Sequence, residues 1–233
     1  MPLSPFVIEK TRALLPILNA PIPLPANKPL SDSRMKVRAL LLDAAEKMLQ
    51  TEGVAKLQAR PLAKAANIAV GSVYNLFDDL DALIIEVNAR TLVLVGTTVI
   101  GTVENANAQG LDAKATLFQL AEDYISFVEN NRERWEATLR SNRATMKDAP
   151  VWYLQKQAVL FQLISIVLTD LPNLHPNLDL EHYSKTMWGT VNGLVTSGFH
   201  GALDGEARKH DRRRQVNTAV TALLAACEHT SVG

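Results

Sequence analysis

Polar side chains that can read or grip a nucleic acid gather in one short segment, residues 70–77. Ser72 can hydrogen-bond to a base or a phosphate, Tyr74 offers a hydroxyl to a phosphate, and the amide of Asn75 can pair with the edge of an adenine. Gly71 lets the backbone approach another molecule closely. The chemistry that this segment favours is therefore recognition of DNA.

Basic residues precede this segment. The chain has 24 basic and 24 acidic residues in total, but residues 34–76 hold seven basic and three acidic ones. A basic module joined to an acidic remainder is typical of a protein of which one part meets a polyanion. The candidate DNA-binding residues are Arg34, Lys36, Arg38, Arg60, Lys64, Ala69, Val70, Gly71, Ser72, Tyr74 and Asn75.

Three predicted helices must position these side chains. Residues 31–33 supply N-cap candidates, and apolar residues at three- and four-residue spacing predict a helix that Gly53 ends. A second helix fits residues 59–66, and Asn67, which tolerates a left-handed backbone, allows a tight turn before a third helix at residues 70–76. This plan is a helix-turn-helix, whose last helix can lie in a major groove.

Apolar residues are expected to hold the third helix in place. Val73 and Phe77 lie four residues apart, so they are predicted to anchor this helix inward against the two preceding helices. Asp78 and Asp81 then bracket the start of a fourth helix that reaches at least Arg90.

The same stretch resembles the TetR family of bacterial regulators. It reads LLDAA at residues 41–45, EG at 52–53 and LAKAANIAVGSVYNLF at 62–77, and the family pattern runs roughly ILDAA, ExG and IAxxAGVSxGxLYxHF. The resemblance covers about fifty of the 233 residues. It implies a homodimer in which the last two helices of each subunit form a four-helix bundle, and a regulator that binds a small molecule.

Four positions depart from the family pattern. Asn67 stands where the family often has Gly, Val70 and Leu80 where it often has Lys, and Leu76 where it often has His. Three of these positions are commonly phosphate contacts. Each lost contact should reduce the slope of log affinity against log salt concentration by roughly one. The residues expected to compensate are Lys28, Arg34, Lys36 and Arg38.

The rest of the chain predicts a helical bundle behind a proline-rich start. Seven of the 11 prolines fall within the first thirty residues, which favours an extended arm with one short helix near residues 7–15. The helices expected after residue 80 are 112–130, 132–143, 151–169, 180–203 and 206–227. We expect an all-α protein with an arm (residues 1–33), a three-helix DNA-binding domain (34–80) and a C-terminal regulatory and dimerisation bundle (81–233).

The bundle contains candidates for a ligand pocket and a dimer interface. Aromatic residues can line a pocket for a small apolar ligand, although core packing is the favoured explanation for any single one of them; they are Phe118, Tyr124, Phe127, Trp135, Trp152, Phe161 and Trp188. By the resemblance, apolar stripes on the last two helices form the interface: Val191, Leu194, Val195, Phe199, Val216, Val220, Leu223 and Leu224. A two-fold dimer places two recognition helices about one DNA turn apart and predicts a palindromic operator.

Other features favour no further chemistry. The single cysteine, Cys227, is expected to be a small core residue, and the sequence indicates no metal site, cofactor, catalytic motif or signal peptide. No run approaches the roughly 20 apolar residues of a membrane span, so a cytoplasmic protein is expected. The basic run at residues 208–214 is either a second nucleic-acid patch or, as we favour, a solvated helix start or an interface salt-bridge site.

These observations predict a dimeric transcriptional repressor that a small molecule releases from double-stranded DNA. Two alternatives remain open. In the first, the bundle serves only dimerisation, and a solid bundle core without a pocket would favour it. In the second, the neutral Val70, Leu76 and Leu80 belong to a helical interaction module that binds no DNA even at low salt.

Overall fold

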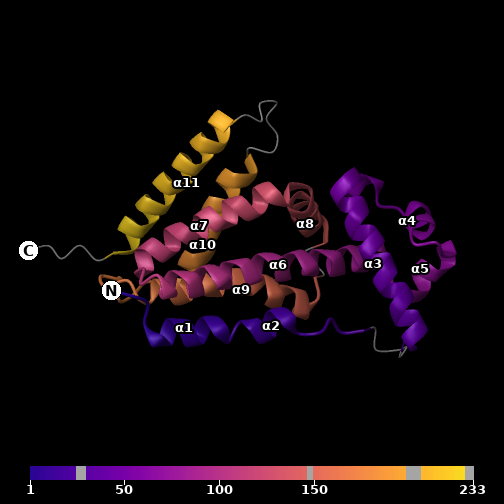
Figure 1. Ribbon diagram of the computed structural model, residues 1–233, viewed down its shortest axis with the longest axis horizontal. Helices are drawn as coiled ribbons and strands as arrows, with labels where there is room; N and C mark the ends of the chain where they lie inside the picture. Colours follow the sequence, from indigo (N-terminus) through magenta and orange to yellow (C-terminus); the bar gives the residue numbers. More distant parts are fainter. Residues whose placement is uncertain (25–29, 146–148, 198–205, 229–233) are drawn as a thin grey trace, which may run out of the picture. The chain divides into compact units, whose positions relative to one another are not determined.

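The computed structural model describes residues 1–24, 30–145, 149–197 and 206–228, and over these ranges the chain is all-α, as the sequence predicts. One isolated bridge joins Leu174 and Glu228. The helices (Figure 1) are α1 (Pro5–Arg12), α2 (Leu15–Asn19), α3 (Asp32–Glu52), the 3-10 turn η1 (Val54–Lys56), α4 (Ala59–Ala65), α5 (Val70–Leu76), α6 (Leu80–Ala108), α7 (Ala113–Asn130), α8 (Arg132–Thr145), α9 (Val151–Leu168), α10 (Leu180–Ser197) and α11 (Glu206–Cys227).

The chain forms two compact units. Unit 1 comprises Met1–Asn19, Val95–Asn130 and Gln157–Gly233, and unit 2 comprises Ala20–Leu94 and Asn131–Lys156. Helices α6 and α9 therefore contribute residues to both units. This division differs from the three consecutive segments expected from the sequence, because packing joins segments that are distant along the chain.

Unit 2 is built around the predicted helix-turn-helix. Helices α4 and α5 pack against each other and against α3, and the three lie side by side in Figure 1. Leu41, Leu62, Val73, Phe77 and Leu83 are buried together in their core. The predicted inward anchoring of α5 by Val73 and Phe77 is confirmed.

Local signals place the ends of these helices. Ser31 stands at the N-cap of α3 and Gly53 ends this helix at a φ of +77°, both as predicted. Helix α6 differs in one detail, because its first turn is capped by Asp79 instead of Asp78: the Ala82 amide donates to the Asp79 carboxylate at 2.7 Å. Such a cap satisfies an amide that has no partner within the helix.

The start of the chain forms two helices, where the sequence predicted an extended arm with one short helix near residues 7–15. Pro5 lies in the first turn of α1, where proline costs no hydrogen bond, and Ser4 caps this helix by accepting from the Val7 amide. The Ser4 hydroxyl also donates to Asp170 at 2.7 Å. Val7 and Leu18 are fully buried, so α1 and α2 are part of the core of unit 1.

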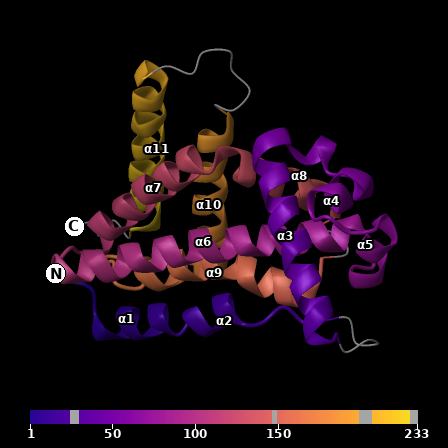
Figure 2. The ribbon, with the colours of Figure 1, turned by 45° about the vertical axis from the view of Figure 1, so that its right-hand side comes forward.

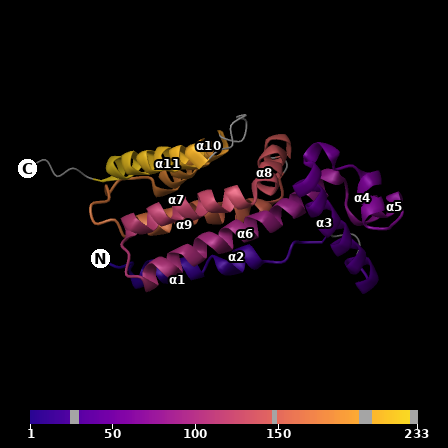
Figure 3. The ribbon, with the colours of Figure 1, turned by 45° about the horizontal axis from the view of Figure 1, so that its top comes forward.

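The remainder of unit 1 is a bundle of long helices. Helix α11 packs along α10 and α7, as Figures 2 and 3 show from two directions. Helix α6 continues through its β-branched stretch without a break, because Thr91, Val95 and Val103 are buried and tertiary packing outweighs their modest helix propensity.

Within the ranges that the structure describes, two helices, α6 and α9, are long and apolar enough to cross a membrane by length and composition alone. Of the most apolar stretch of α6, 72% is buried within the protein, and 39% of that of α9. Core helices of proteins that never meet a membrane have the same composition, so this feature is weak evidence for a membrane span.

Candidate DNA interface and ligand pocket

The turn between α4 and α5 follows from its sequence. Asn67 has a φ of +54°, as predicted for a residue that tolerates a left-handed backbone. The Ile68 amide donates to the Ala63 carbonyl at 2.9 Å and closes the turn. Ala69 then takes the extended N-cap position of α5 without a side-chain hydrogen bond. The result is a tight turn between two short helices.

Helix α5 has one buried and one exposed face. Val73 and Leu76 are buried, whereas Gly71, Tyr74 and Asn75 are exposed. The exposed fraction of Tyr74 is 54%, which is high for an aromatic side chain. The polar groups that the sequence assigned to DNA contact therefore lie on the solvent side of α5, and Ser72 is half-buried beside them.

Packing explains two of the departures from the family pattern. Leu76 belongs to the core of unit 2, and Leu80 packs against the same core while partly exposed. A histidine or lysine at these places would lose the apolar contacts that these leucines make. Val70 differs, because it is exposed and its neutral side chain leaves the surface of α5 without a cation there.

A groove of about 470 Å³ runs beside α5 and contains one candidate cation. It is lined by Arg34, Val37, Ser72, Asn75 and Leu76. The Arg34 guanidinium donates to the Asn75 carbonyl at 2.8 Å, near the end of α5 where backbone carbonyls favour a cation. The structure thus brings together three of the predicted DNA-binding residues, Arg34, Ser72 and Asn75.

Arg38 is placed differently from the prediction. Its side chain is only 8% exposed, pairs with the equally buried Glu86 and lies 4.7 Å from the centre of the Phe77 ring. Burial raises the pKa of the Glu86 carboxyl, and the adjacent guanidinium opposes this shift. Arg38 therefore stabilises the core of unit 2 and does not present its charge to a phosphate, which corrects its assignment as a DNA contact.

Three other predicted cations lie at the surface. Lys36 on α3 and Arg60 and Lys64 on α4 are exposed, so each is available to a phosphate. Lys28, which was expected to compensate for lost charge, lies outside the described residues. Along the chain, the exposed cations that lie closest to α5 are thus Arg60 and Lys64 of α4.

Unit 2 contains an ion-pair cluster that the sequence did not predict. Arg90 of α6 pairs with Asp43 at 2.7 Å and with Glu46 at 2.9 Å, both on α3, and Arg134 of α8 pairs with Glu46 at 2.5 Å. The cluster ties α3 to two other helices. Because its members are 44 or more residues apart across helices, no local pattern could reveal it.

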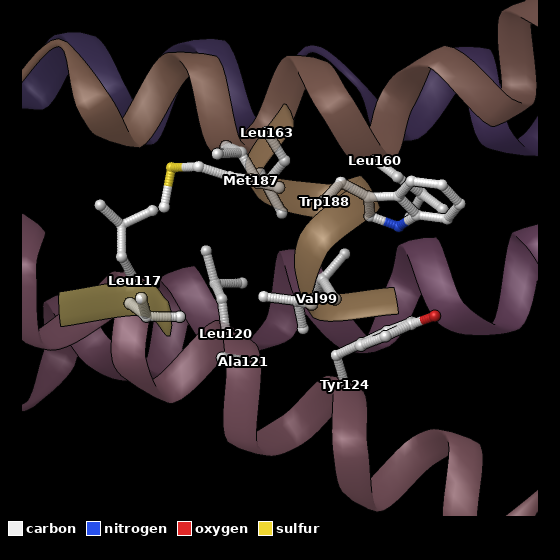
Figure 4. A pocket seen from close by; sticks show the side chains of 12 residues that line it. Val99, Leu117, Leu120, Ala121, Tyr124, Leu160, Leu163, Met187 and Trp188 are labelled. Carbon is white, nitrogen blue, oxygen red and sulfur yellow. The ribbon is translucent and has the colours of Figure 1, made fainter. Parts of the chain in front are cut away.

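Unit 1 contains an apolar pocket of about 60 Å³ (Figure 4). Its walls come from α6, α7, α9, α10 and α11, and the lining residues are Val99, Leu117, Leu120, Ala121, Tyr124, Leu160, Leu163, Ile164, Met187, Trp188, Val191 and Val220. None of these residues is charged. A pocket of this kind favours a mainly apolar ligand.

Two of the seven predicted pocket residues, Tyr124 and Trp188, line this pocket. Phe161 stands behind it and meets the Trp188 ring edge-on, with ring centres 5.3 Å apart. Among the described residues, Phe118 and Phe127 of α7 do not belong to its lining. Trp135 and Trp152 belong to unit 2 and do not line this pocket: Trp135 is almost fully buried in a core, and Trp152 lines a separate pocket of unit 2.

The predicted dimer stripes are placed mainly inside the subunit. Val191, Val195, Val216, Val220 and Leu224 are buried within unit 1. Leu194 and Leu223 are half-buried, and Phe199 lies outside the described residues. The buried members cannot also form a surface for a second subunit, because α10, α11 and α7 already use these side chains to pack against one another.

Part of the basic run on α11 forms ion pairs. Arg212 and Arg213 pair with Glu129 of α7, and Arg213 also pairs with Glu122. Hydrogen bonds to Glu129 are the main reason that the pKa of Arg213 is raised. These two arginines therefore form their ion pairs within unit 1, where the sequence predicted a solvated helix start or salt bridges at an interface. Cys227 is buried, as expected of a core residue.

No group of three or more His, Cys, Asp or Glu side chains that could hold a metal ion occurs within the ranges that the structure describes. Unit 2 also holds a more polar pocket of about 160 Å³, which Trp152, Phe77 and Glu86 help to line. The exposed face of α5 with its groove and the apolar pocket of unit 1 are the features that best match the predicted DNA and ligand sites. Fold and site together define an all-α protein with a helix-turn-helix domain.

Comparison with known proteins supports this class. Residues 41–87 match the family model of the bacterial regulatory proteins of the tetR family. No curated protein matches the chain by sequence. The helix-turn-helix of this chain thus matches the TetR family, as the motif predicted.

Solved structures share the fold at low sequence identity. A Rhodococcus sp. RHA1 protein of unknown function has a TM-score of 0.67 and 21% identity, over 88% of this chain and 99% of that one. A TetR-family transcriptional regulator from Streptomyces coelicolor has a TM-score of 0.56 and 19% identity, over 80% and 99%. The repressor FadR of Thermus thermophilus, in complex with lauroyl-CoA, has a TM-score of 0.58 and 18% identity, over 84% and 97%.

Proposed function

We propose that this protein is a cytoplasmic transcriptional repressor that binds a palindromic operator as a homodimer and leaves it when a small apolar molecule binds. The observation that carries the proposal is the exposed face of α5. A side-chain carbon added at Gly71 would meet no atom within 4 Å among the described residues, so the packing of the protein itself does not require glycine there. Close approach of a DNA backbone would require it.

The groove beside α5 supports a division of labour on DNA. Asn75 can read an adenine edge, Ser72 and Tyr74 can bind phosphate or base, and Arg34 supplies a cation at the end of the helix. Lys36, Arg60 and Lys64 are exposed for phosphate contact. Affinity then depends mainly on electrostatic attraction to the phosphates, and specificity depends on few side chains.

The apolar pocket supports control by a ligand. Helix α6 contains Leu83 and Val87 of the helix-turn-helix core as well as Val99 of the pocket. A ligand that prefers one position of α6 shifts the population of DNA-binding conformations by its difference in affinity for the two. The lauroyl chain bound by the Thermus relative is apolar like this pocket. The pocket thus favours this mechanism over a bundle that serves only dimerisation.

Small residues on α10 and α11 are the surface that we propose for the dimer, in place of the buried stripes. Gly189 and Gly193 of α10 and Ala222 and Ala225 of α11 are exposed, and small residues let helices approach closely. A side-chain carbon at Gly193 would meet nothing within 4 Å among the described residues. Gly193→Arg should therefore leave the subunit folded and convert a dimer to a monomer in sedimentation equilibrium.

Selection of bound sites from random double-stranded DNA tests the proposal directly. We expect a two-fold symmetric site, and fluorescence anisotropy should show that its affinity falls steeply with salt. Asn75→Ala should relax specificity at one base position of each half-site. Gly71→Ala should lower affinity while it keeps or raises the thermal stability of the protein.

Two matched variants separate a specific cation from net charge. Arg34→Ala should weaken binding to all sequences and reduce the salt slope by about one for each subunit. Lys47→Ala removes the same charge from the same helix, about 20 Å farther along it, and should leave the affinity unchanged. Absence of any DNA binding at low salt, or a selected site without symmetry, contradicts the proposal.

A further inference from the structure

The polar groups at the pocket of unit 1 indicate what kind of molecule it selects. Only two of its side chains carry a polar atom, Tyr124 and Trp188, and Figure 4 shows the Tyr124 oxygen and the Trp188 nitrogen on the same side of the pocket. The remaining lining is aliphatic, apart from the thioether of Met187. A ligand that fits this lining carries at most a small polar part at one side.

The two polar groups differ in what they can still offer. The Tyr124 hydroxyl donates its hydrogen to the side-chain oxygen of Asn192 at 2.6 Å, so its proton is engaged. The indole nitrogen Nε1 of Trp188 is buried and has no hydrogen-bond partner in the part of the chain that the structure describes. A buried donor without a partner has lost its hydrogen bond to water, and a ligand that supplies an acceptor restores one.

We infer that the pocket binds an uncharged, mainly apolar molecule that presents one hydrogen-bond acceptor, such as a carbonyl oxygen, to Nε1 of Trp188. This inference rests on the proposed function and assigns the chemical class of its ligand. An anionic group is excluded because no lining residue offers a positive charge, and a desolvated charge without a partner is costly. A ligand whose polar group can only donate a hydrogen bond is not favoured, because Nε1 of Trp188 is itself a donor and needs an acceptor.

The size of the pocket restricts the ligand further. Its volume of about 60 Å³ lies below the roughly 150 Å³ of an engineered apolar cavity that holds benzene. The flexible side chain of Met187 lines it and can change rotamer to admit a larger body. A molecule of about one ring therefore binds only when the lining, first of all Met187, moves to enlarge the pocket, and larger bodies need more movement.

Three one-ring probes test this inference by calorimetric titration of the full chain: acetophenone, ethylbenzene and benzoate. They share a ring and differ in offering a neutral acceptor, no acceptor or an anion. The probes also differ in their free energy of transfer from water. The decisive quantity is therefore the ratio of acetophenone affinity to ethylbenzene affinity, compared between the wild type and Trp188→Phe. We expect this ratio to fall about 3- to 10-fold in Trp188→Phe, because an ordinary hydrogen bond contributes about 0.5 to 1.5 kcal/mol.

Two further measurements complete the test. Trp152→Phe, a matched substitution in unit 2, should leave the ratio unchanged, and retained ethylbenzene binding by Trp188→Phe shows that its pocket is folded. Benzoate should bind at least about tenfold more weakly than acetophenone. An unchanged ratio in Trp188→Phe, benzoate binding as tight as that of acetophenone, or no binding of any probe overturns the inference.

Operator binding, measured separately, distinguishes this failure from that of the proposed function. If the protein binds DNA but none of the probes, the inferred ligand class is contradicted and the proposed DNA-binding function still stands. Probe binding with the expected ratio, but without any change of operator affinity, supports the ligand class and removes release by ligand from the proposed function.

Discussion

Gly96 of α6 is predicted to be required by the packing of the N-terminal helices. A side-chain carbon built at Gly96 would lie 2.6 Å and 2.7 Å from the two methyl carbons of Leu18 and 3.3 Å from its Cγ. Non-bonded carbons prefer about 3.5 to 4.0 Å, and Leu18 is fully buried, so it has little room to retreat. Gly96→Ala therefore overpacks unit 1.

The magnitude follows from a comparison within the same helix. Gly→Ala in a helix gains about 1 kcal/mol in propensity, and overpacking a core costs about 1 to 3 kcal/mol. Gly101 is also in α6, and a side-chain carbon there meets nothing within 4 Å among the described residues. Because propensity contributes equally to both, Gly96→Ala should be about 1 to 3 kcal/mol less stable than Gly101→Ala.

Urea unfolding at one protein concentration measures this difference. Leu18→Ala should itself cost about 2 to 5 kcal/mol, and in that background Gly96→Ala should become as favourable as Gly101→Ala, since the clashing methyl groups are gone. Equal stabilities of Gly96→Ala and Gly101→Ala in the wild-type background would refute the reasoning. They would mean that α2 does not pack closely on α6.

Three other expectations follow. Arg38→Ala should lower the free energy of unfolding by about 3 to 5 kcal/mol, because it leaves the buried Glu86 carboxylate without its partner; a loss below about 1 kcal/mol in urea unfolding contradicts this. Asp79→Ala should cost about 0.5 to 2 kcal/mol through the lost cap of α6, whereas Asp78→Ala, one residue earlier, should be neutral in the same assay. Burial raises the pKa of Tyr183 to about 12 from an ordinary value of 10.0, so its stabilising effect is complete below pH 10 and is lost as the pH rises toward 12. Absorbance titration should show a midpoint near 12 that Tyr183→Phe removes, and a titration curve near pH 12 that Tyr183→Phe leaves unchanged would contradict it.

Much of unit 2 could be predicted from the sequence, because its signals are local. Gly53 and Asn67 adopt positive φ where the sequence placed a helix end and a tight turn. Val73 and Phe77 are buried as their four-residue spacing requires, and Tyr74 and Asn75 between them are exposed. Each of these outcomes depends on backbone preference or helical periodicity within a few residues, which a single sequence contains.

Only the tertiary structure decided which charges are free and which aromatic residues share a pocket. Arg38 lies among the other basic residues in sequence, but it is paired with Glu86, 48 residues away, and is lost to DNA. Trp135 and Trp188 looked alike as pocket candidates, yet the fold places them in different units. Helical periodicity predicts that a residue faces inward. It does not predict which residue it contacts, because that partner comes from a distant segment of the chain.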